Sequence, residues 1–245
     1  MGYGGNTSCV EILLTSGDVL VFDAGTGIRD VAVASPNKTH LFFSHFHWDH
    51  VQGLPFFAPL YQQESAVHFY SSAYAAPLRE ALAGQMKSPY FPIDFHGLPS
   101  RHEFTELGAT GFREANVHVL PFGLHHPQGA CGYRIESQGT VIVYATDHEL
   151  GNAQIDAGVV AAAQDADLLI FDAQYAPSEM ERCRGRGHST WQDAVDVAKR
   201  ARVRQLVLFH HDPDRTDDAV AAIVAAAREH FPNTAAARES WTITF

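Results

Sequence analysis

The sequence predicts an α/β protein in which sheets are covered by helices, and two observations support this fold class. Short β-prone apolar runs occur in two groups, within residues 9–70 and within residues 117–209. Alanine-rich or amphipathic helical stretches lie between and after these runs, a pattern typical of layered α/β architectures. No stretch rich in Pro, Gly and Ser divides the chain, so we predict a single domain over residues 1–245.

The first group of apolar runs predicts four strands. They are Cys9–Leu14, Val19–Phe22, Thr39–Phe43 and Ala66–Tyr70. The turn signal Gly17-Asp18 between the first two indicates a hairpin. Residues 51–57, which follow the third strand closely, predict a short helix or turn.

Asp23 directly follows the second strand and has two interpretations. It either hydrogen-bonds a metal-binding histidine through its carboxylate or forms a local turn with its neighbours. The run Leu168–Asp172 has the same pattern as Val19–Asp23, and Leu206–His210 resembles Leu41–His45. These matches suggest two similar halves.

A helix is predicted over Ala75–Gln85, with Pro77 in its first turn. The segment 86–100 that follows is rich in Pro and aromatic residues and is too apolar for disorder. We interpret it as a wall or lid over a functional cleft, with Tyr90 and Phe91 as candidates for stacking on a ring. The alternative is that these aromatic side chains pack a small core of their own.

The second group of apolar runs predicts five strands, and a sixth closes the chain. They lie at 117–121, 131–136, 141–145, 168–171, 203–209 and 241–245. An alanine-rich helix is expected over 153–164, and Thr216 is expected to cap a final helix. Ser189-Thr-Trp-Gln192 has the form of a capping box that opens a further helix.

Composition places the chain among globular proteins, with 46% hydrophobic and 18% charged residues and no apolar run long enough to cross a membrane. The first residues have neither the charged nor the apolar region of a signal peptide. The three cysteines form no CxxC pair, which is typical of reduced thiols. We therefore expect a cytoplasmic protein with no membrane partner.

The formal net charge of −11 argues against a broad electrostatic grip on a nucleic-acid polymer, because such a grip needs several Lys or Arg contacts to phosphates. A small anionic ligand remains compatible, since salt confines the global field to about 8–10 Å. We expect a small anionic substrate and no stable nucleic-acid polymer partner, and we leave a homodimer open.

Four metal-capable side chains fall directly after the strand Thr39–Phe43. They are His45, His47, Asp49 and His50. Neutral imidazoles and a carboxylate together suit a divalent transition metal. Four ligands from one loop are too many for a single ion with an open position, so we interpret the loop as shared by two ions. The alternative, a polar loop that happens to be rich in histidine, is disfavoured by the specific spacing H-x-H-x-D-H.

This motif belongs to a wider set of segments that resembles the metallo-β-lactamase superfamily. The set consists of residues 45–50, 123–134, 144–149 and 187–213. Gly187-His-Ser-Thr190, followed by a helix and by Leu206–His210, looks like the ribonuclease Z and small-phosphodiesterase branch of that superfamily. The resemblance implies a four-layer αββα sandwich with metals at one edge between the sheets.

The resemblance also implies which residues bind metal. One ion would be held by His45, His47 and His126, the second by Asp49, His50 and His210, and Asp147 would bridge them. His125 and His211 are the alternatives to their neighbours His126 and His210. The implied cofactors are two divalent ions, with Zn²⁺ expected and Mn²⁺ or Fe²⁺ open.

The implied chemistry is metal-dependent hydrolysis. Two ions can share a hydroxide, because metal binding lowers the pKa of water towards ~7. Asp49 would orient that hydroxide, and His188 is the candidate general acid or donor to a phosphoryl oxygen. The alternative role of His188 is a local hydrogen bond before a helix.

We therefore expect a dinuclear hydrolase of a small phosphodiester or cyclic nucleotide that acts through a metal-bridging hydroxide. The alternative is a lactone, thioester or β-lactam hydrolase on the same metal site. No inserted arm of the kind that ribonuclease Z uses to hold transfer RNA is visible, which disfavours transfer-RNA processing. The basic run Arg182–Arg186 before His188 is either a small phosphate-binding patch or a solvated loop paired with Glu179 and Glu181.

Overall fold

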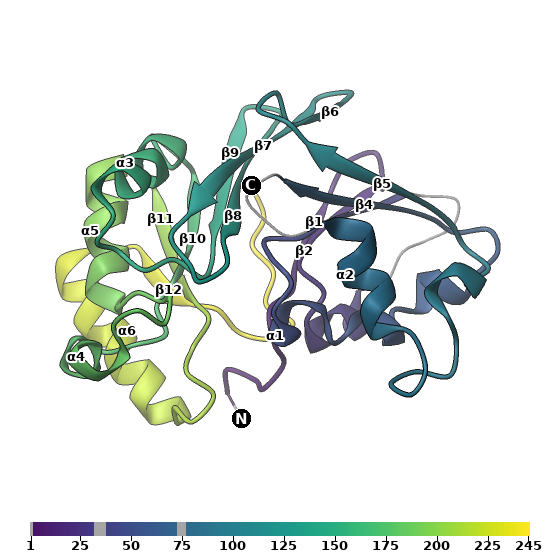
Figure 1. Cartoon of the computed structure of the whole chain (residues 1–245). Helices are drawn as coiled ribbons and strands as arrows, with labels where there is room; N and C mark the ends of the chain where they lie inside the picture. The colour runs from purple at the N-terminus through teal and green to yellow at the C-terminus, as the bar shows by residue number, and fades with distance from the viewer. Residues whose placement is uncertain (1, 32–37, 73–76) are drawn as a thin grey trace. The chain divides into compact units, whose positions relative to one another are not determined.

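The computed structural model describes residues 2–31, 38–72 and 77–245, which form two compact units. The N-terminal unit consists of residues 6–108, and the C-terminal unit consists of residues 109–245 together with the residues up to Gly5. Each unit contains one sheet with helices (Figure 1). The predicted α/β fold class is confirmed, and the single domain over residues 1–245 stays a prediction.

The sheet of the N-terminal unit has five strands in the order β1-β2-β3-β4-β5. They are β1 (Val10–Leu13), β2 (Val19–Phe22), β3 (Lys38–Phe42), β4 (Ala66–Ser72) and β5 (Arg101–Leu107). The first two form the predicted hairpin, and β2 to β5 run parallel. All four predicted strands are confirmed. The sequence analysis missed β5 because its sequence RHEFTEL has no buried apolar run.

Short helices connect the strands of this sheet. They are η1 (Thr26–Asp30), α1 (Trp48–Val51), η2 (Leu54–Phe56), η3 (Ala58–Tyr61), α2 (Leu78–Gln85) and η4 (Phe95–Gly97). Their buried side chains pack with those of the sheet in one core, which includes Leu41, Phe69 and Leu82. The helix predicted over 75–85 begins at Leu78 with Pro77 as its N-cap, and its residues 75 and 76 lie outside the described residues.

The segment 86–100 contains no strand and only the short η4. Met86, Phe95 and Leu98 are buried in the core of the N-terminal unit, whereas Tyr90 is 73% exposed. Part of the segment therefore packs as core. The wall or lid role of its exposed part stays a prediction.

The sheet of the C-terminal unit has seven strands in the order β12-β11-β10-β9-β8-β7-β6. They are β6 (Phe112–Glu114), β7 (Val117–Leu124), β8 (Ala130–Ser137), β9 (Thr140–Ala145), β10 (Leu168–Asp172), β11 (Gln205–Phe209) and β12 (Thr234–Ala236). Strands β6 to β9 are antiparallel, and β9 to β12 run parallel. The five strands predicted between 117 and 209 are confirmed as β7 to β11.

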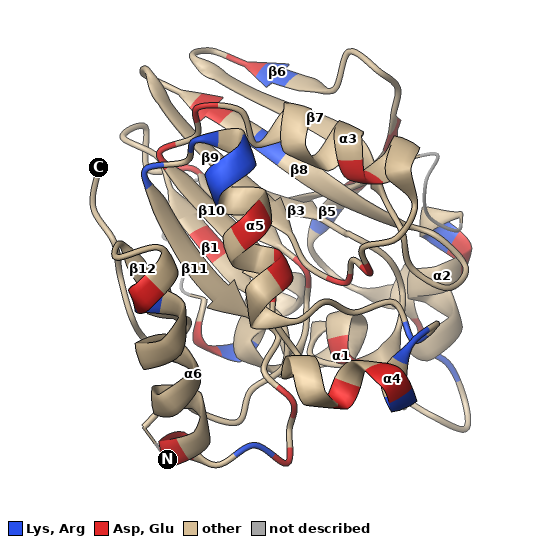
Figure 2. Ribbon diagram, turned by 90° about the vertical axis from the view of Figure 1, so that its left-hand side faces the viewer, with Lys and Arg blue, Asp and Glu red and all other residues tan. Residues whose placement is uncertain are grey.

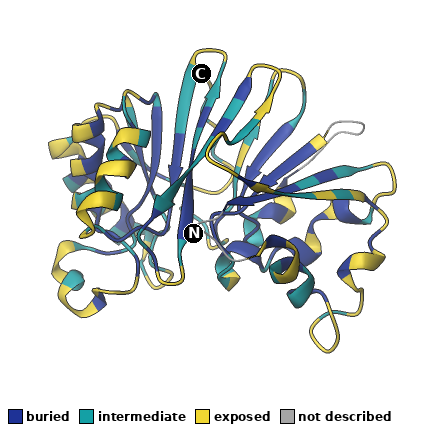
Figure 3. Ribbon diagram, turned by 45° about the horizontal axis from the view of Figure 1, so that its top comes forward, coloured by how far each residue is buried: buried dark blue, intermediate teal, exposed yellow. Residues whose placement is uncertain are grey.

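Helices pack on this sheet. They are α3 (Ala153–Ala162), η5 (Pro177–Glu179), α4 (Met180–Cys183), α5 (Trp191–Ala201) and α6 (Asp217–His230). Within the C-terminal unit, α3, α5 and α6 cover one face of the sheet (Figure 1), and their apolar stripes share a core with Leu169, Phe171 and Leu206. Figure 3 shows mostly buried strands and exposed outer helix faces. None of the helices in the described ranges has the length and apolar character of a membrane span.

The strand predicted at 241–245 is wrong. These residues form no strand and are half-buried or exposed. The place beside β11 is taken by β12, which pairs with it in parallel. The alternation Trp-Thr-Ile-Thr-Phe has the period of a strand. A strand also needs the unoccupied edge of a neighbouring strand to pair with, and the local sequence carries no information about which edges are occupied.

The capping box predicted at Ser189–Gln192 is displaced by one residue. Thr190 is the N-cap of α5 and forms the reciprocal pair with Asp193. Ser189 is used elsewhere, because its N–H donates to Asp172 and its hydroxyl donates to the carbonyl of His148. The predicted helix is therefore present, but its capping box is formed by Thr190 and Asp193 and not by Ser189 and Gln192.

Candidate metal centre

In the N-terminal unit, the loop after β3 is held by Asp23, which lies at the carboxyl end of β2. One oxygen of Asp23 accepts from the Ser44 N–H at 2.7 Å. The other accepts from the Ser44 hydroxyl at 2.8 Å and lies 2.8 Å from Nδ1 of His50. Since a carboxylate only accepts, His50 carries its proton on Nδ1, and Nε2 keeps the lone pair that a metal needs. This geometry favours the first interpretation of Asp23.

The predicted ligands of this loop lie close together. The ring centroid of His45 is 4.5 Å from that of His47 and 4.2 Å from that of His50. Nε2 of His50 lies 3.4 Å from Oδ2 of Asp49, and both atoms are acceptors. Two ligand atoms placed 2.0–2.2 Å from a tetrahedral zinc ion are about 3.4 Å apart. The spacing therefore fits a shared cation, and the donor set suits a transition metal.

In the C-terminal unit, three parallel strands deliver further candidates at one edge of the sheet. Asp147 follows β9, Asp172 ends β10 and His210 follows β11. Ligand atoms of these three residues and of His188 all lie within 4.8 Å of one another. The backbone φ angles of Asp147 and His210 are 55° and 57°, in the left-handed region that non-glycine residues rarely adopt. Such strain is typical of functional sites.

Asp147 is the centre of this group. Its Oδ1 lies 3.4 Å from Nε2 of His210, and its Oδ2 lies 3.7 Å from Nε2 of His126 and 4.0 Å from Nε2 of His188. The side chain of Asp147 is only 2% exposed. A buried carboxylate among three imidazoles is again a donor set that a divalent metal ion fits.

The contacts of the neighbouring histidines bear on the two open choices between them. His126 directs Nδ1 to the carbonyl of Gly187 at 2.9 Å, which leaves Nε2 near Asp147, whereas Nδ1 of His125 contacts the carbonyl of Glu149. The ring of His211 packs edge-on against the ring of Tyr3, with the two centroids 6.0 Å apart. We keep His126 and His210 as the proposed ligands.

Asp172 is a functional candidate that the sequence analysis missed. Its carboxylate, which is fully buried, lies 2.7 Å from Nδ1 of His188 and accepts the backbone N–H groups of Asp147 and Ser189. It therefore orients His188 and fixes the turn that carries Asp147. A signal was present in the sequence, because Asp172 directly follows the apolar run Leu168–Phe171 as Asp23 directly follows Val19–Phe22.

Glu149 is a second residue that the sequence analysis missed. Its carboxylate accepts the N–H of Gly185 at 2.8 and 2.9 Å and the N–H of Gly187 at 2.8 Å. Gly187 has a φ of +88°, and a Cβ there would overlap the ring of His126. The turn before His188 is therefore held in one conformation from both sides.

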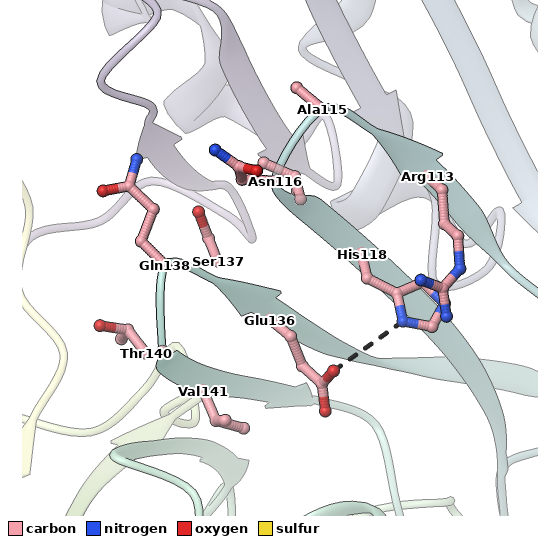
Figure 4. A pocket seen from close by; sticks show the side chains of 11 residues that line it. Arg113, Ala115, Asn116, His118, Glu136, Ser137, Gln138, Thr140 and Val141 are labelled. Atoms are coloured by element: carbon pink, nitrogen blue, oxygen red, sulfur yellow. Dashed lines mark ion pairs between the residues drawn. The ribbon is translucent and has the colours of Figure 1, made fainter.

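A hollow of about 400 Å³ lies at the opposite ends of β7 and β9 from His126 and Asp147 (Figure 4). Its lining includes His118, whose Nδ1 is 3.9 Å from Oε2 of Glu136. None of the predicted site residues lines it, and we assign it no part in the chemistry.

Several proteins are similar to this chain. Over 250 residues, which cover 84% of this chain and 81% of the relative, it is 26% identical to the ribonuclease Z of Natronomonas pharaonis. Over 86 residues it is 43% identical to the ribonuclease Z of Gemmatimonas aurantiaca, a match that spans 27% of that protein. The crystal structure of the metallo-beta-lactamase fold protein YhfI from Bacillus subtilis matches with a TM-score of 0.72 and 16% identity, over 98% of this chain and 94% of YhfI.

These matches confirm three of the predictions made from the sequence. The predicted metallo-β-lactamase fold is confirmed by the two sheets with helices and by the match to YhfI. The expected resemblance to the ribonuclease Z branch and the expectation of a metal-dependent hydrolase are also confirmed.

The expected partner is wrong. A small anionic substrate and no nucleic-acid polymer were predicted, but a relative that matches over 84% of this chain is a ribonuclease Z. The prediction failed because net charge is a property of the whole chain. Screening limits each charge to roughly 8–10 Å, so an acidic protein can still present a local cationic surface to RNA.

The superfamily itself is shown by a direct match. The family model described as the Beta-lactamase superfamily domain matches residues 19–211, which include every predicted metal ligand and His188. This chain therefore belongs to the beta-lactamase superfamily.

Proposed function

We propose that this protein hydrolyses phosphodiester bonds of RNA with two divalent metal ions. The observation that carries the substrate class is the match to ribonuclease Z over more than four fifths of both chains. The imidazole and carboxylate side chains in the two units support the proposed binding of metal ions. The contact between His188 and Asp172 supports proton transfer to a leaving oxygen.

Seven side chains are proposed as metal ligands. They are His45, His47, Asp49, His50, His126, Asp147 and His210. We propose two ions rather than one because seven imidazole and carboxylate ligands exceed the four ligands of one tetrahedral site. We propose zinc, with manganese or iron as the alternatives to be distinguished by metal analysis.

The protein groups have separate tasks in this proposal. Divalent ions held by these ligands would lower the pKa of a bound water and polarise the phosphoryl group. Asp49 orients the attacking water, whose oxygen forms the new bond to phosphorus and whose proton passes to the solvent. His188 donates its Nε2 proton to the oxygen of the bond that breaks, while Asp172 holds Nδ1 and balances the charge of the protonated ring.

The test combines metal analysis of the purified protein with a substrate panel. We expect cleavage of a precursor transfer RNA or of a single-stranded RNA oligonucleotide, lost on chelation and restored by metal. Turnover of a lactone, thioester or β-lactam without RNA cleavage would contradict the proposed substrate. Fewer than one ion per chain after metal-replete purification would contradict the two-ion site.

Exchanging Asp23 for asparagine is expected to weaken metal binding about 10–100-fold, the usual effect of losing a partner that orients a ligand histidine. The amide cannot accept the Nδ1 proton of His50 and the two Ser44 donors as the carboxylate does. Affinity is measured by competition with a chromophoric chelator. Asp30→Asn, an exposed acid in the same unit, is the matched control, and equal affinity in both variants would refute the role of Asp23.

A further inference from the structure

The turn Arg184–Gly187 links α4 to His188 and has a fixed backbone. Gly185 and Gly187 both have positive φ angles, of 84° and 88°. Glu149, which is 5% exposed, accepts the N–H groups of both glycines. Because these N–H groups are already bonded, any anion at this turn must be bound by side chains.

Two arginine side chains project from this turn. Arg184 and Arg186 are exposed, and in the described part of the chain neither forms an ion pair. Arg182 differs, since it contacts Glu179 at 3.3 Å. Of the two interpretations of this basic run, pairing with glutamate therefore applies to Arg182 only. Lys and Arg positions, blue in Figure 2, occur on and beside α4.

Arg186 is also close to the proposed proton donor. It precedes His188 by two residues, so their Cα atoms are at most about 7.6 Å apart. The ring of Tyr175 packs edge-on against His188 at 5.9 Å. Burial raises the pKa of Tyr175, and a side-chain hydrogen bond from Arg186 partly opposes that shift. The cationic turn and His188 thus belong to one local structure.

We propose that Arg184 and Arg186 bind phosphates of the RNA strand next to the scissile bond. Guanidinium groups bind phosphate through two parallel hydrogen bonds, and their charge persists at any working pH. Two such groups on a rigid turn offer a local cationic surface although the chain carries a net charge of −11. This inference rests on the proposed function, since it names the part of the substrate that the site holds.

The experiment uses the metal-loaded enzyme and the double variant Arg184→Ala/Arg186→Ala. We measure equilibrium binding of a fluorescent single-stranded RNA by anisotropy at several salt concentrations, and hydrolysis of that RNA and of bis(p-nitrophenyl) phosphate. The affinity for RNA and the kcat/KM for RNA cleavage are expected to fall roughly tenfold. The kcat/KM for the small diester is expected to fall by less. The slope of log affinity against log salt is expected to shrink by about 1.4, at about 0.7 per lost contact to single-stranded RNA.

Two further variants separate charge from structure. Arg184→Lys/Arg186→Lys keeps the charges and is expected to keep the salt slope. Arg200→Ala, an exposed arginine near the end of α5, is expected to behave like the wild type. An unchanged slope in the alanine double variant, or an equal loss with RNA and the small diester, would overturn the inference.

The two proposals fail in different ways. RNA that binds with the expected salt dependence but is not cut would contradict the proposed function and leave the arginine site supported. RNA that is cut equally well by the wild type and the alanine double variant would support the function and contradict the arginine site.

Discussion

Replacement of Asp147 by asparagine is expected to lower kcat/KM by more than 100-fold and to reduce the metal content from about two ions per chain to one or fewer. Even the loss of a residue that only supports a ligand typically costs 10–100-fold, so the loss of a proposed bridging ligand should cost more. The asparagine side chain would keep the volume of the aspartate but not the charge that lies between three imidazoles. Metal analysis and RNA cleavage measure the two effects.

The control for this variant is Asp196→Asn, which changes an exposed carboxylate on α5 of the same unit. It is expected to retain metal and activity. Thermal unfolding of both variants checks that the C-terminal unit remains folded. Two bound ions and near wild-type cleavage in Asp147→Asn would refute the bridging role.

The sequence predicted the metal loop because all of its candidate ligands are local. His45, His47, Asp49 and His50 lie within a few residues of one another, so spacing alone restricts them to one place. The strand that delivers them was also predictable, since β3 ends in apolar residues directly before the loop, and its neighbour β2 is a short, continuous apolar run. Local patterns were therefore enough to propose both the position and the chemistry of this half of the ligand set.

The supporting residues could not be predicted in the same way. Asp172 acts on Asp147 and His188, and Glu149 acts on the backbone of Gly185 and Gly187. These contacts join residues 16 to 38 positions apart, and their partners are mostly backbone N–H groups, which every residue type except proline has. Only the folded chain shows which N–H groups approach which carboxylate.

The errors have the same origin. Residues 241–245 alternate as a strand does, but pairing depends on which strand already occupies the edge beside β11. The acidic net charge correctly describes the whole chain, but it does not locate Arg184 and Arg186 on an exposed turn. Strand pairing and the position of a cationic surface both depend on long-range structure. Neither the alternation of residues 241–245 nor the net charge of the chain contains that information.

Replacement of His188 by alanine is expected to lower kcat for RNA about 10²–10⁴-fold, the usual contribution of a general acid, while metal content stays at the wild-type value. Asp172 holds Nδ1 of this ring at 2.7 Å and so leaves Nε2 to donate. A proton donor matters most when the leaving oxygen is a poor leaving group. The loss should therefore be smaller with bis(p-nitrophenyl) phosphate, whose leaving group departs readily as an anion.

This dependence on the leaving group separates proton donation from a structural role of His188. A structural role would reduce cleavage of RNA and of the small diester by the same factor, and it would be accompanied by a change in metal content or thermal stability. His96→Ala, an exposed histidine of the other unit, is the control and should leave both reactions intact. Asp172→Asn should reproduce part of the leaving-group effect, because the ring then loses the carboxylate that orients it. Equal losses for the two substrates in His188→Ala would remove proton donation from the mechanism, and His188 would remain only as the residue that joins the arginine turn to α5.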